Sequence, residues 1–130
     1  MQRLWFFLGA LLMASGIGLG AYGAHGLRIV VTLPRQIEAF EYAVQYQLIQ
    51  GLSLFVCSWA MTQFRAGLVN LAATLFLLGT LCFSLSIYLL ILCNWRPWPF
   101  ITPTGGFLLI MGWLVLGLAA FFKEPSYKRW

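Results

Sequence analysis

Four runs of apolar residues, separated by short polar segments, constrain this sequence more than any other feature. A helix needs about 20 largely apolar residues to cross the hydrocarbon core of a bilayer. The four runs cover about residues 4–24, 44–64, 67–93 and 102–122. Together they use nearly all of the 130 residues and leave no room for a soluble catalytic domain. The sequence therefore predicts an all-α membrane protein, folded as one four-transmembrane-helix bundle over residues 1–130.

The scarcity of charge supports this prediction. Only 8% of the residues are charged, against roughly 25% in a soluble domain, and the mean hydropathy is +0.87. So few charges cannot cover a surface that faces water, so the lipid bilayer is the expected partner. The net charge of +5 is scattered along the chain, whereas a nucleic-acid site needs Lys and Arg gathered on one face. Nucleic acid is therefore not expected as a partner.

The second apolar run is preceded by an amphipathic segment at about residues 34–44. Ile37, Phe40 and Val44 recur at spacings of three and four, which is typical of one face of a helix. Pro34 suits the first turn, where its missing N–H has no partner to lose. We therefore expect one long helix that begins near the membrane surface and continues as the second span.

A stripe of small residues lies in the first apolar run, where Gly16, Gly20 and Ala24 are spaced four apart. Small side chains allow another helix to approach closely, which promotes association inside lipid. Two interpretations stay open. The stripe packs against a neighbouring span of the same chain, or it forms a dimerisation seam.

The distribution of Lys and Arg in the connections predicts the orientation. With four spans, one side of the membrane would hold five cations and the other side three. These sets are Arg3, Arg65, Lys123, Lys128 and Arg129 on the first side, and Arg28, Arg35 and Arg96 on the second. The positive-inside rule then places both the N and C termini in the cytoplasm, with Trp95 and Trp98 as anchors at the opposite interface.

Four polar stretches would meet at that opposite, outer end of the bundle. The candidate residues in this polar cluster are His25, Glu41, Gln45, Gln47, Tyr88 and Thr102. We expect His25, Glu41, Gln45 and Tyr88 to form a network between helices, because an unpaired charge is costly inside a membrane. The other half of the bundle is expected to be plain Leu, Ala and Phe, so any site should lie at the outer end.

The inventory of reactive side chains argues against catalysis. The chain has no aspartate and a single histidine, so a bis-histidine haem is excluded and no metal-ligand spacing occurs. Cys57, Cys82 and Cys93 lie in apolar runs without a CxxC motif and are expected to behave as small apolar residues. We therefore expect no catalytic residues, no metal and no cofactor, and we do not expect an enzyme.

Four ordered motifs carry a family resemblance: GAYGAHG, FEYAVQYQ, GTLCFSLSIYLL, and ITPTGG followed by GW. Over about residues 16–113 the chain resembles the YgdD/YwdK-like family of small bacterial inner-membrane proteins, which also has mitochondrial relatives. The resemblance implies a four-span, multi-pass protein of the bacterial inner membrane and carries no established biochemical function. This chain has Gln50 and Leu85 where family members usually have histidine and glycine. A two-histidine site is therefore not expected.

Three functions remain open at this point. The first is an accessory, assembly or interaction subunit of a larger membrane complex, which includes self-association. The second is a small oligomeric transporter or channel, although no carboxylate lies in the middle of the first, third or fourth span to exchange a proton for a cation. The third is a membrane enzyme acting on lipid or quinone, for which no catalytic set is present.

Overall fold

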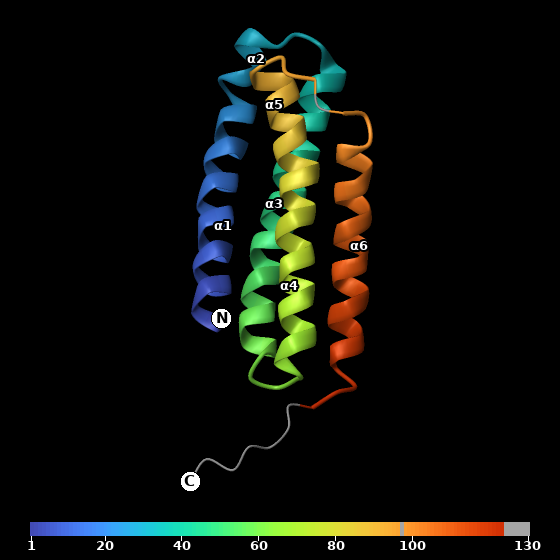
Figure 1. Ribbon diagram of the computed structural model, residues 1–130. Coiled ribbons are helices and arrows are strands. Elements are labelled where there is room, and N and C mark those ends of the chain that lie inside the picture. Colours follow the sequence, from blue (N-terminus) through green and yellow to red (C-terminus); the bar gives the residue numbers. More distant parts are fainter. Residues whose placement is uncertain (97, 124–130) are drawn as a thin grey trace.

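A computed structural model describes residues 1–96 and 98–123, and every regular element within them is helical (Figure 1). The elements are α1 (Gln2–Ala24), α2 (Leu27–Val30), α3 (Pro34–Ala60), α4 (Ala66–Thr80), the π-helical turn η1 (Leu81–Leu85), α5 (Ser86–Leu92) and α6 (Ile101–Ala119). Because α4, η1 and α5 follow one another without a break, they form a single rod.

Among the described residues, three helices are long and apolar enough to cross a membrane: α1, the rod 66–92, and α6. The fourth long helix, α3, has 27 residues but is less apolar, because its first turns carry Arg35, Glu38 and Glu41. The prediction of an all-α membrane protein built as a helical bundle is confirmed.

Two helices end earlier than the apolar runs suggested. The run at 44–64 continues past the end of α3 at Ala60, and the run at 102–122 continues past the end of α6 at Ala119. The backbone N–H of Arg65 donates to the Phe122 carbonyl at 2.9 Å, and Phe64 and Lys123 form an antiparallel bridge. These two segments therefore pair with each other instead of continuing their helices.

The four long helices form two packed pairs. α1 packs mainly against α3, α6 packs mainly against α4 and η1, and the contact between α3 and α4 joins the pairs (Figure 1). The start of α1, the turn between α3 and α4 and the end of α6 lie at one end of the bundle, and α2 lies at the other. α1 and α6 are therefore the outer helices, each with a broad side that no other part of the described chain covers.

Glycines bring the helices of each pair close together. A Cβ added at Gly105 of α6 would lie 2.5 Å from the Phe83 backbone nitrogen and 2.8 Å from the Gly79 carbonyl oxygen. A Cβ at Gly16 of α1 would lie 2.8 Å from Cδ2 of Leu48 on α3. Close packing of this kind supplies the attraction between helices that lipid does not provide.

The predicted small-residue stripe faces α3, but Ala24 does not belong to it. Gly16 is buried and Gly20 packs against Val44, whereas Ala24 is exposed and Gly23 packs against Phe40 instead. Each residue turns a helix by about 100°, so two steps of four drift by about 80°, whereas seven residues return to within about 20°. The packing stripe therefore ends at Gly23, and inclusion of Ala24 was wrong.

Candidate functional site

The side chain of Gln47 connects three helices in the half of the bundle that holds α2. Its Nε2 donates to the Leu12 carbonyl at 3.0 Å and to Ser15 Oγ at 2.8 Å, both on α1. Its Oε1 accepts a hydrogen bond of 2.7 Å from the hydroxyl of Tyr88 on α5. One amide therefore fixes the positions of α1, α3 and α5 relative to one another.

The hydrogen bonds of Gln47 are well suited to an apolar environment. Gln47 and Tyr88 are both buried, and both amide hydrogens of Gln47 are used. Ser15 Oγ accepts one of these hydrogen bonds, and its own hydroxyl donates to the Leu11 carbonyl at 2.8 Å. A polar group without a partner is costly in lipid, so this complete pairing stabilises the arrangement.

A cleft of about 200 Å³ opens beside Gln47 between α1, α3 and the rod 66–92. Its polar lining comes from Ser15, Gln47, Thr80, Ser84 and Tyr88. Most of these groups already have partners, since Thr80 donates to the Phe76 carbonyl and Ser84 to the Ala43 carbonyl, both at 2.7 Å. No charged residue lines the cleft, so it can orient a neutral polar group but offers no ionised acid or base.

The predicted network of His25, Glu41, Gln45 and Tyr88 does not form. Glu41 makes a salt bridge of 3.0 Å with Arg28, in which both side chains are about half exposed. Nδ1 of His25 lies 3.0 Å from the Ala21 carbonyl, and it carries the proton there because a carbonyl only accepts. Gln45 is exposed and makes no hydrogen bond with the described residues.

Helix geometry explains why Gln47 and not Gln45 meets Tyr88. Two positions along α3 correspond to a rotation of about 200°, so the two amides point in nearly opposite directions. Gln45 shares the exposed face with Glu41, four residues earlier, while Gln47 faces α1 and α5. The structure thus separates the predicted polar cluster into a surface part and a buried part.

Thr102, the last member of the predicted cluster, belongs to neither part. Its hydroxyl lies 2.7 Å from the Ser86 hydroxyl and joins the first turn of α6 to α5. Ser86 also donates to the Phe83 carbonyl at 2.8 Å, so Thr102 is the donor in the contact between the two hydroxyls. This hydrogen bond joins α5 to α6 at the end of the bundle that holds α2.

The opposite half of the bundle is not plain, which corrects the expectation from the sequence. The indole N–H of Trp5 donates to Asn70 Oδ1 at 2.8 Å and links α1 to α4. Gln2 and Ser58 each donate to the backbone carbonyl of the other, at 3.2 and 3.0 Å. Isolated polar residues inside apolar runs indicate such hydrogen bonds. The spacing of residues along the sequence, however, cannot identify partners that lie more than 50 positions apart.

The sequence did not predict two further features, the buried amide of Gln50 and a π-helical turn. Gln50 is 2% exposed, and its Oε1 has no hydrogen-bond partner in the described chain. The π-helical turn η1 lies where Gly105 of α6 approaches the backbone of Phe83. Such turns are often found at functional sites, but no sequence pattern here predicts one.

Among the described residues, no group of three His, Cys, Asp or Glu side chains is arranged to hold a metal ion.

Comparison with known proteins supplies the family. Residues 19–106 match the family model described as a protein of unknown function (DUF423). A UPF0382 membrane protein of Staphylococcus haemolyticus is 39% identical over 120 residues, which cover 92% of this chain and 97% of that protein. The UPF0382 membrane protein YwdK of Bacillus subtilis is 32% identical over the same length, with the same coverage of both chains. No solved structure matches. The chain is therefore a multi-pass membrane protein that belongs to the DUF423/UPF0382 family of bacterial membrane proteins.

Proposed function

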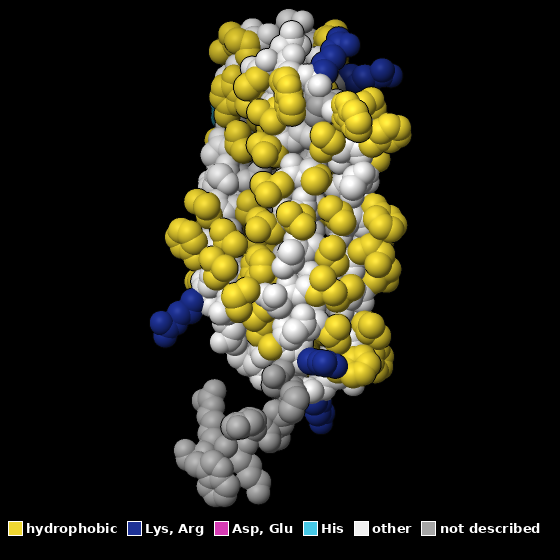
Figure 2. All heavy atoms as spheres, viewed as in Figure 1, with side chains coloured by type: hydrophobic (Ala, Val, Ile, Leu, Met, Phe, Trp, Pro, Cys, Tyr) yellow, Lys and Arg dark blue, Asp and Glu magenta, His cyan; other side chains and the backbone are white. Residues whose placement is uncertain are grey.

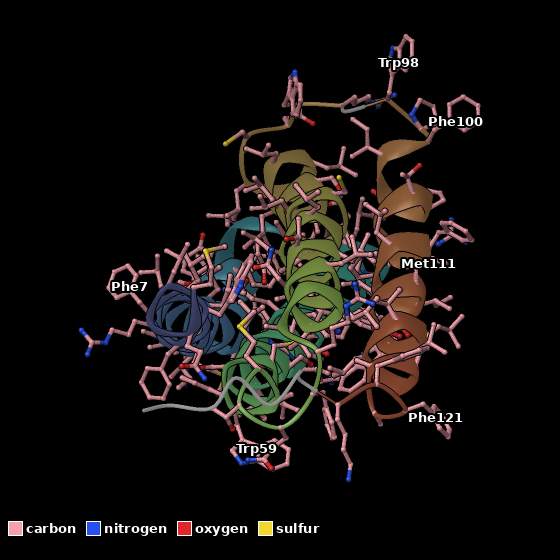
Figure 3. All side chains as sticks on the ribbon, turned by 60° about the horizontal axis from the view of Figure 1, so that its bottom comes forward. Phe7, Trp59, Trp98, Phe100, Met111 and Phe121 are labelled. Carbon is pink, nitrogen blue, oxygen red and sulfur yellow. The ribbon has the colours of Figure 1, made fainter. Side chains whose placement is uncertain are left out.

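We propose that the protein crosses the bacterial inner membrane four times, with α3 as the fourth span and both termini in the cytoplasm. α3 runs alongside α1, and its charged residues are confined to its first turns, Arg35 to Glu41, at one end of the bundle. Hydrophobic side chains cover the visible face between the two ends, and Lys and Arg lie near the ends (Figure 2). Trp98 and Phe100 lie on the connection between α5 and α6, where an interfacial anchor is expected (Figure 3).

The orientation depends on the last residues of the chain. In the described part, Arg3, Arg65 and Lys123 lie at the end where α1 begins, and Arg28, Arg35 and Arg96 lie at the other. The excess on the cytoplasmic side comes from Lys128 and Arg129, which lie outside the described residues. Fusion of green fluorescent protein and of alkaline phosphatase to the C-terminus tests this. We expect fluorescence without phosphatase activity, and the reverse pattern would refute the orientation.

We propose that the protein is an accessory or interaction subunit of a larger membrane complex and not an enzyme. The observation that carries this proposal is the open side of α1. Ala10, Ala14 and Gly18 lie four residues apart on an exposed face, and a Cβ added at Gly18 would meet nothing within 4 Å. Phe7 also points away from the bundle on this side of α1 (Figure 3). Small residues on a helix that lacks a second neighbour favour close docking of a transmembrane helix.

The internal polar groups support a structural role. In the Gln47 cleft the hydroxyls of Thr80 and Ser84 donate to backbone carbonyls, and the amide hydrogens of Gln47 hold α1. Groups engaged in this way stabilise the bundle and are not free to move protons or ions. The cleft nevertheless favours a second candidate, an oligomeric transporter in which a neighbouring copy completes the polar path.

Affinity purification from native membranes tests the proposed role. A tagged chain extracted in a mild detergent should bring down a stoichiometric membrane complex, and Gly18→Leu should reduce the yield of the partner at least fivefold. Gly117→Leu, at an equally open position on α6, is the matched control and should retain the partner. If the purified chain is a small homo-oligomer that raises solute flux in liposomes above that of empty vesicles, transport is favoured instead.

A further inference from the structure

A cleft of about 370 Å³ lies between the start of α1 and the end of α3, at the end of the bundle opposite α2. Gln2, Arg3 and Phe6 line it from α1, and Phe55, Ser58 and Trp59 line it from α3. Because α1 is long and apolar enough to cross a membrane, its first turn lies near the membrane surface. The cleft therefore lies where lipid headgroups meet hydrocarbon.

The lining of this cleft changes from polar to apolar along the helix axes. Gln2 and Ser58 bond to each other's backbone carbonyls and form the outer level beside Arg3. Phe6 and Phe55 lie about one turn deeper, and their rings meet edge to face with centroids 4.8 Å apart. A ligand that fills both levels must itself be polar at one end and apolar at the other.

Arg3 is the charged residue of the cleft, and it has no acidic partner in the described chain. Its side chain is exposed and makes no hydrogen bond or ion pair with the described residues. The described acidic residues, Glu38 and Glu41, lie in the first turns of α3 at the other end of the bundle. A guanidinium presents several N–H donors in a planar fork, which matches the oxygens of a phosphate. The polar end of the ligand is therefore expected to be an anion of this kind.

Trp59 marks the level of the headgroup. Its side chain is 60% exposed and points away from the bundle (Figure 3), and indole rings favour the boundary between headgroups and hydrocarbon. A zwitterionic headgroup would bring an ammonium group close to Arg3, and no described acidic residue lines the cleft to receive it. An anionic headgroup avoids this repulsion, so the cleft favours a lipid with a net negative charge.

We propose that this cleft binds one anionic phospholipid, with its phosphate on the guanidinium of Arg3 and an acyl chain along Phe6 and Phe55. A soluble phosphate ester would contact only the outer level, whereas a lipid uses the whole cleft. The site lies between α1 and α3, apart from the small-residue stripe on the open side of α1. It can therefore be occupied whether or not the chain belongs to a larger complex.

Native mass spectrometry of the purified full-length protein in detergent tests the proposal. The probes are dioleoyl phosphatidylglycerol and dioleoyl phosphatidylcholine in equal amounts, which share their chains and differ in headgroup charge. We expect the first bound lipid to be phosphatidylglycerol, with a preference of about fivefold, as for one unit of charge at the membrane surface. Glycerophosphoglycerol, the same headgroup without chains, should not displace it even in large excess.

Two pairs of variants locate the site. Arg3→Gln removes the charge and should bind the two lipids equally, whereas Arg65→Gln should keep the preference. Arg65 is the matched control because it is an exposed cation at the same end of the bundle but outside the cleft. Phe6→Ala should weaken the binding of both lipids, whereas Phe7→Ala, which alters a ring outside the cleft, should weaken neither.

Three outcomes would overturn the proposal. Equal binding of the two lipids to the unmodified protein is the first, and this comparison needs no variant. The second is an equal loss of preference in Arg3→Gln and Arg65→Gln, because the overall charge of this end would then attract the lipid. The third is displacement by glycerophosphoglycerol, which would assign the cleft to a soluble phosphate ester.

Discussion

The two helix pairs of this bundle hold together in different ways. α1 and α3 are joined by side chains that cross the interface, since Gln47 bonds to α1 at two atoms and Gln2 and Ser58 pair near the other end. α4 and η1 meet α6 chiefly through backbone proximity at Gly105. Lipid gives no hydrophobic drive for helix association, so hydrogen bonds and close packing are the two available sources of attraction. The α1–α3 pair uses both sources, since a Cβ at Gly9 of α1 would lie 2.9 Å from the Gly51 carbonyl oxygen, whereas the pair of α6 with α4 and η1 relies chiefly on close packing.

The glycines at these interfaces should differ in what they tolerate. A Cβ at Gly105 would meet backbone atoms of Phe83, Cys82 and Gly79, which cannot move without shifting the helix. A Cβ at Gly16 or Gly23 would meet the side chains of Leu48 or Phe40, which can adjust. We therefore expect Gly105→Ala to cost more than Gly16→Ala or Gly23→Ala.

The largest effect is expected for Gly105→Ala. The added methyl group forces α6 away from η1, so the free energy of unfolding should fall by about 3 kcal/mol, at the upper end of overpacking costs. Titration with SDS in mixed micelles measures this change. Gly106→Ala, whose Cβ would meet nothing within 4 Å, should unfold like the original chain. Equal behaviour of the two variants would show that the close approach does not stabilise this pair.

A smaller loss is expected for Gln47→Leu. The substitution removes the donor to Leu12 and Ser15 and leaves the buried Tyr88 hydroxyl without its acceptor. We expect the free energy of unfolding to fall by about 2 kcal/mol, within the range for a buried group left unsatisfied. The same SDS titration applies, with Gln45→Leu as the exposed control on the same helix. An unchanged midpoint for Gln47→Leu would mean that its hydrogen bonds do not stabilise the packing of α3 against α1.

Gly16→Ala tests how well a side-chain contact between α1 and α3 tolerates an added methyl group. Its Cβ would lie 2.8 Å from Cδ2 of Leu48, a flexible end, so the expected loss is about 1 kcal/mol, at the low end of overpacking. Gly18→Ala, on the open face of α1, is the matched control. A loss for Gly16→Ala as large as that for Gly105→Ala would contradict the proposed difference between side-chain and backbone contacts.

The smallest effects are expected at the surface. Glu41→Gln breaks a half-exposed salt bridge with Arg28, and such pairs contribute at most about 1 kcal/mol. His25→Ala removes a hydrogen bond to the last turn of α1. Both variants should keep the thermal midpoint of the original protein in detergent to within a few degrees, and Glu41→Gln should lose its small effect at high salt. A large drop would mean that the surface part of the cluster is coupled to Gln47.

The sequence predicted the helices well because each apolar run has a physical reason to be helical in lipid. It placed Gln47 and Tyr88 in one polar cluster, but it assigned Gln45 instead of Gln47 to the network with Tyr88. The sequence could not predict which hydrogen-bond partner each buried polar side chain would have. Gln47 and Gln50 are both buried amides on α3 about one turn apart, yet only Gln47 has Ser15 and Tyr88 within reach.

Tertiary pairing also decided the helix ends. Phe64 and Lys123 lie nearly half the chain apart, so their antiparallel bridge could not be predicted from either apolar run alone. The drift of the small-residue stripe toward Gly23 could have been predicted, since it follows from 3.6 residues per turn. The close approach of Gly105 to η1 could not, because it depends on the distance between two helices.

The π-helical turn makes the length of the rod 66–92 as constrained as its composition. Hydrogen bonds in a π turn join residues five apart, so Leu81–Leu85 accommodates one residue more than an ordinary α turn. With the extra residue held there, Gly79 faces α6 before the turn and Tyr88 meets Gln47 after it. Deletion of one residue inside the turn would restore an ordinary α-helix and leave these two faces nearly in phase. Deletion of a residue between the turn and Tyr88 would instead rotate Tyr88 by about 100° and break its hydrogen bond to Gln47. The turn is therefore the part of the rod where a change of one residue in length is tolerated best.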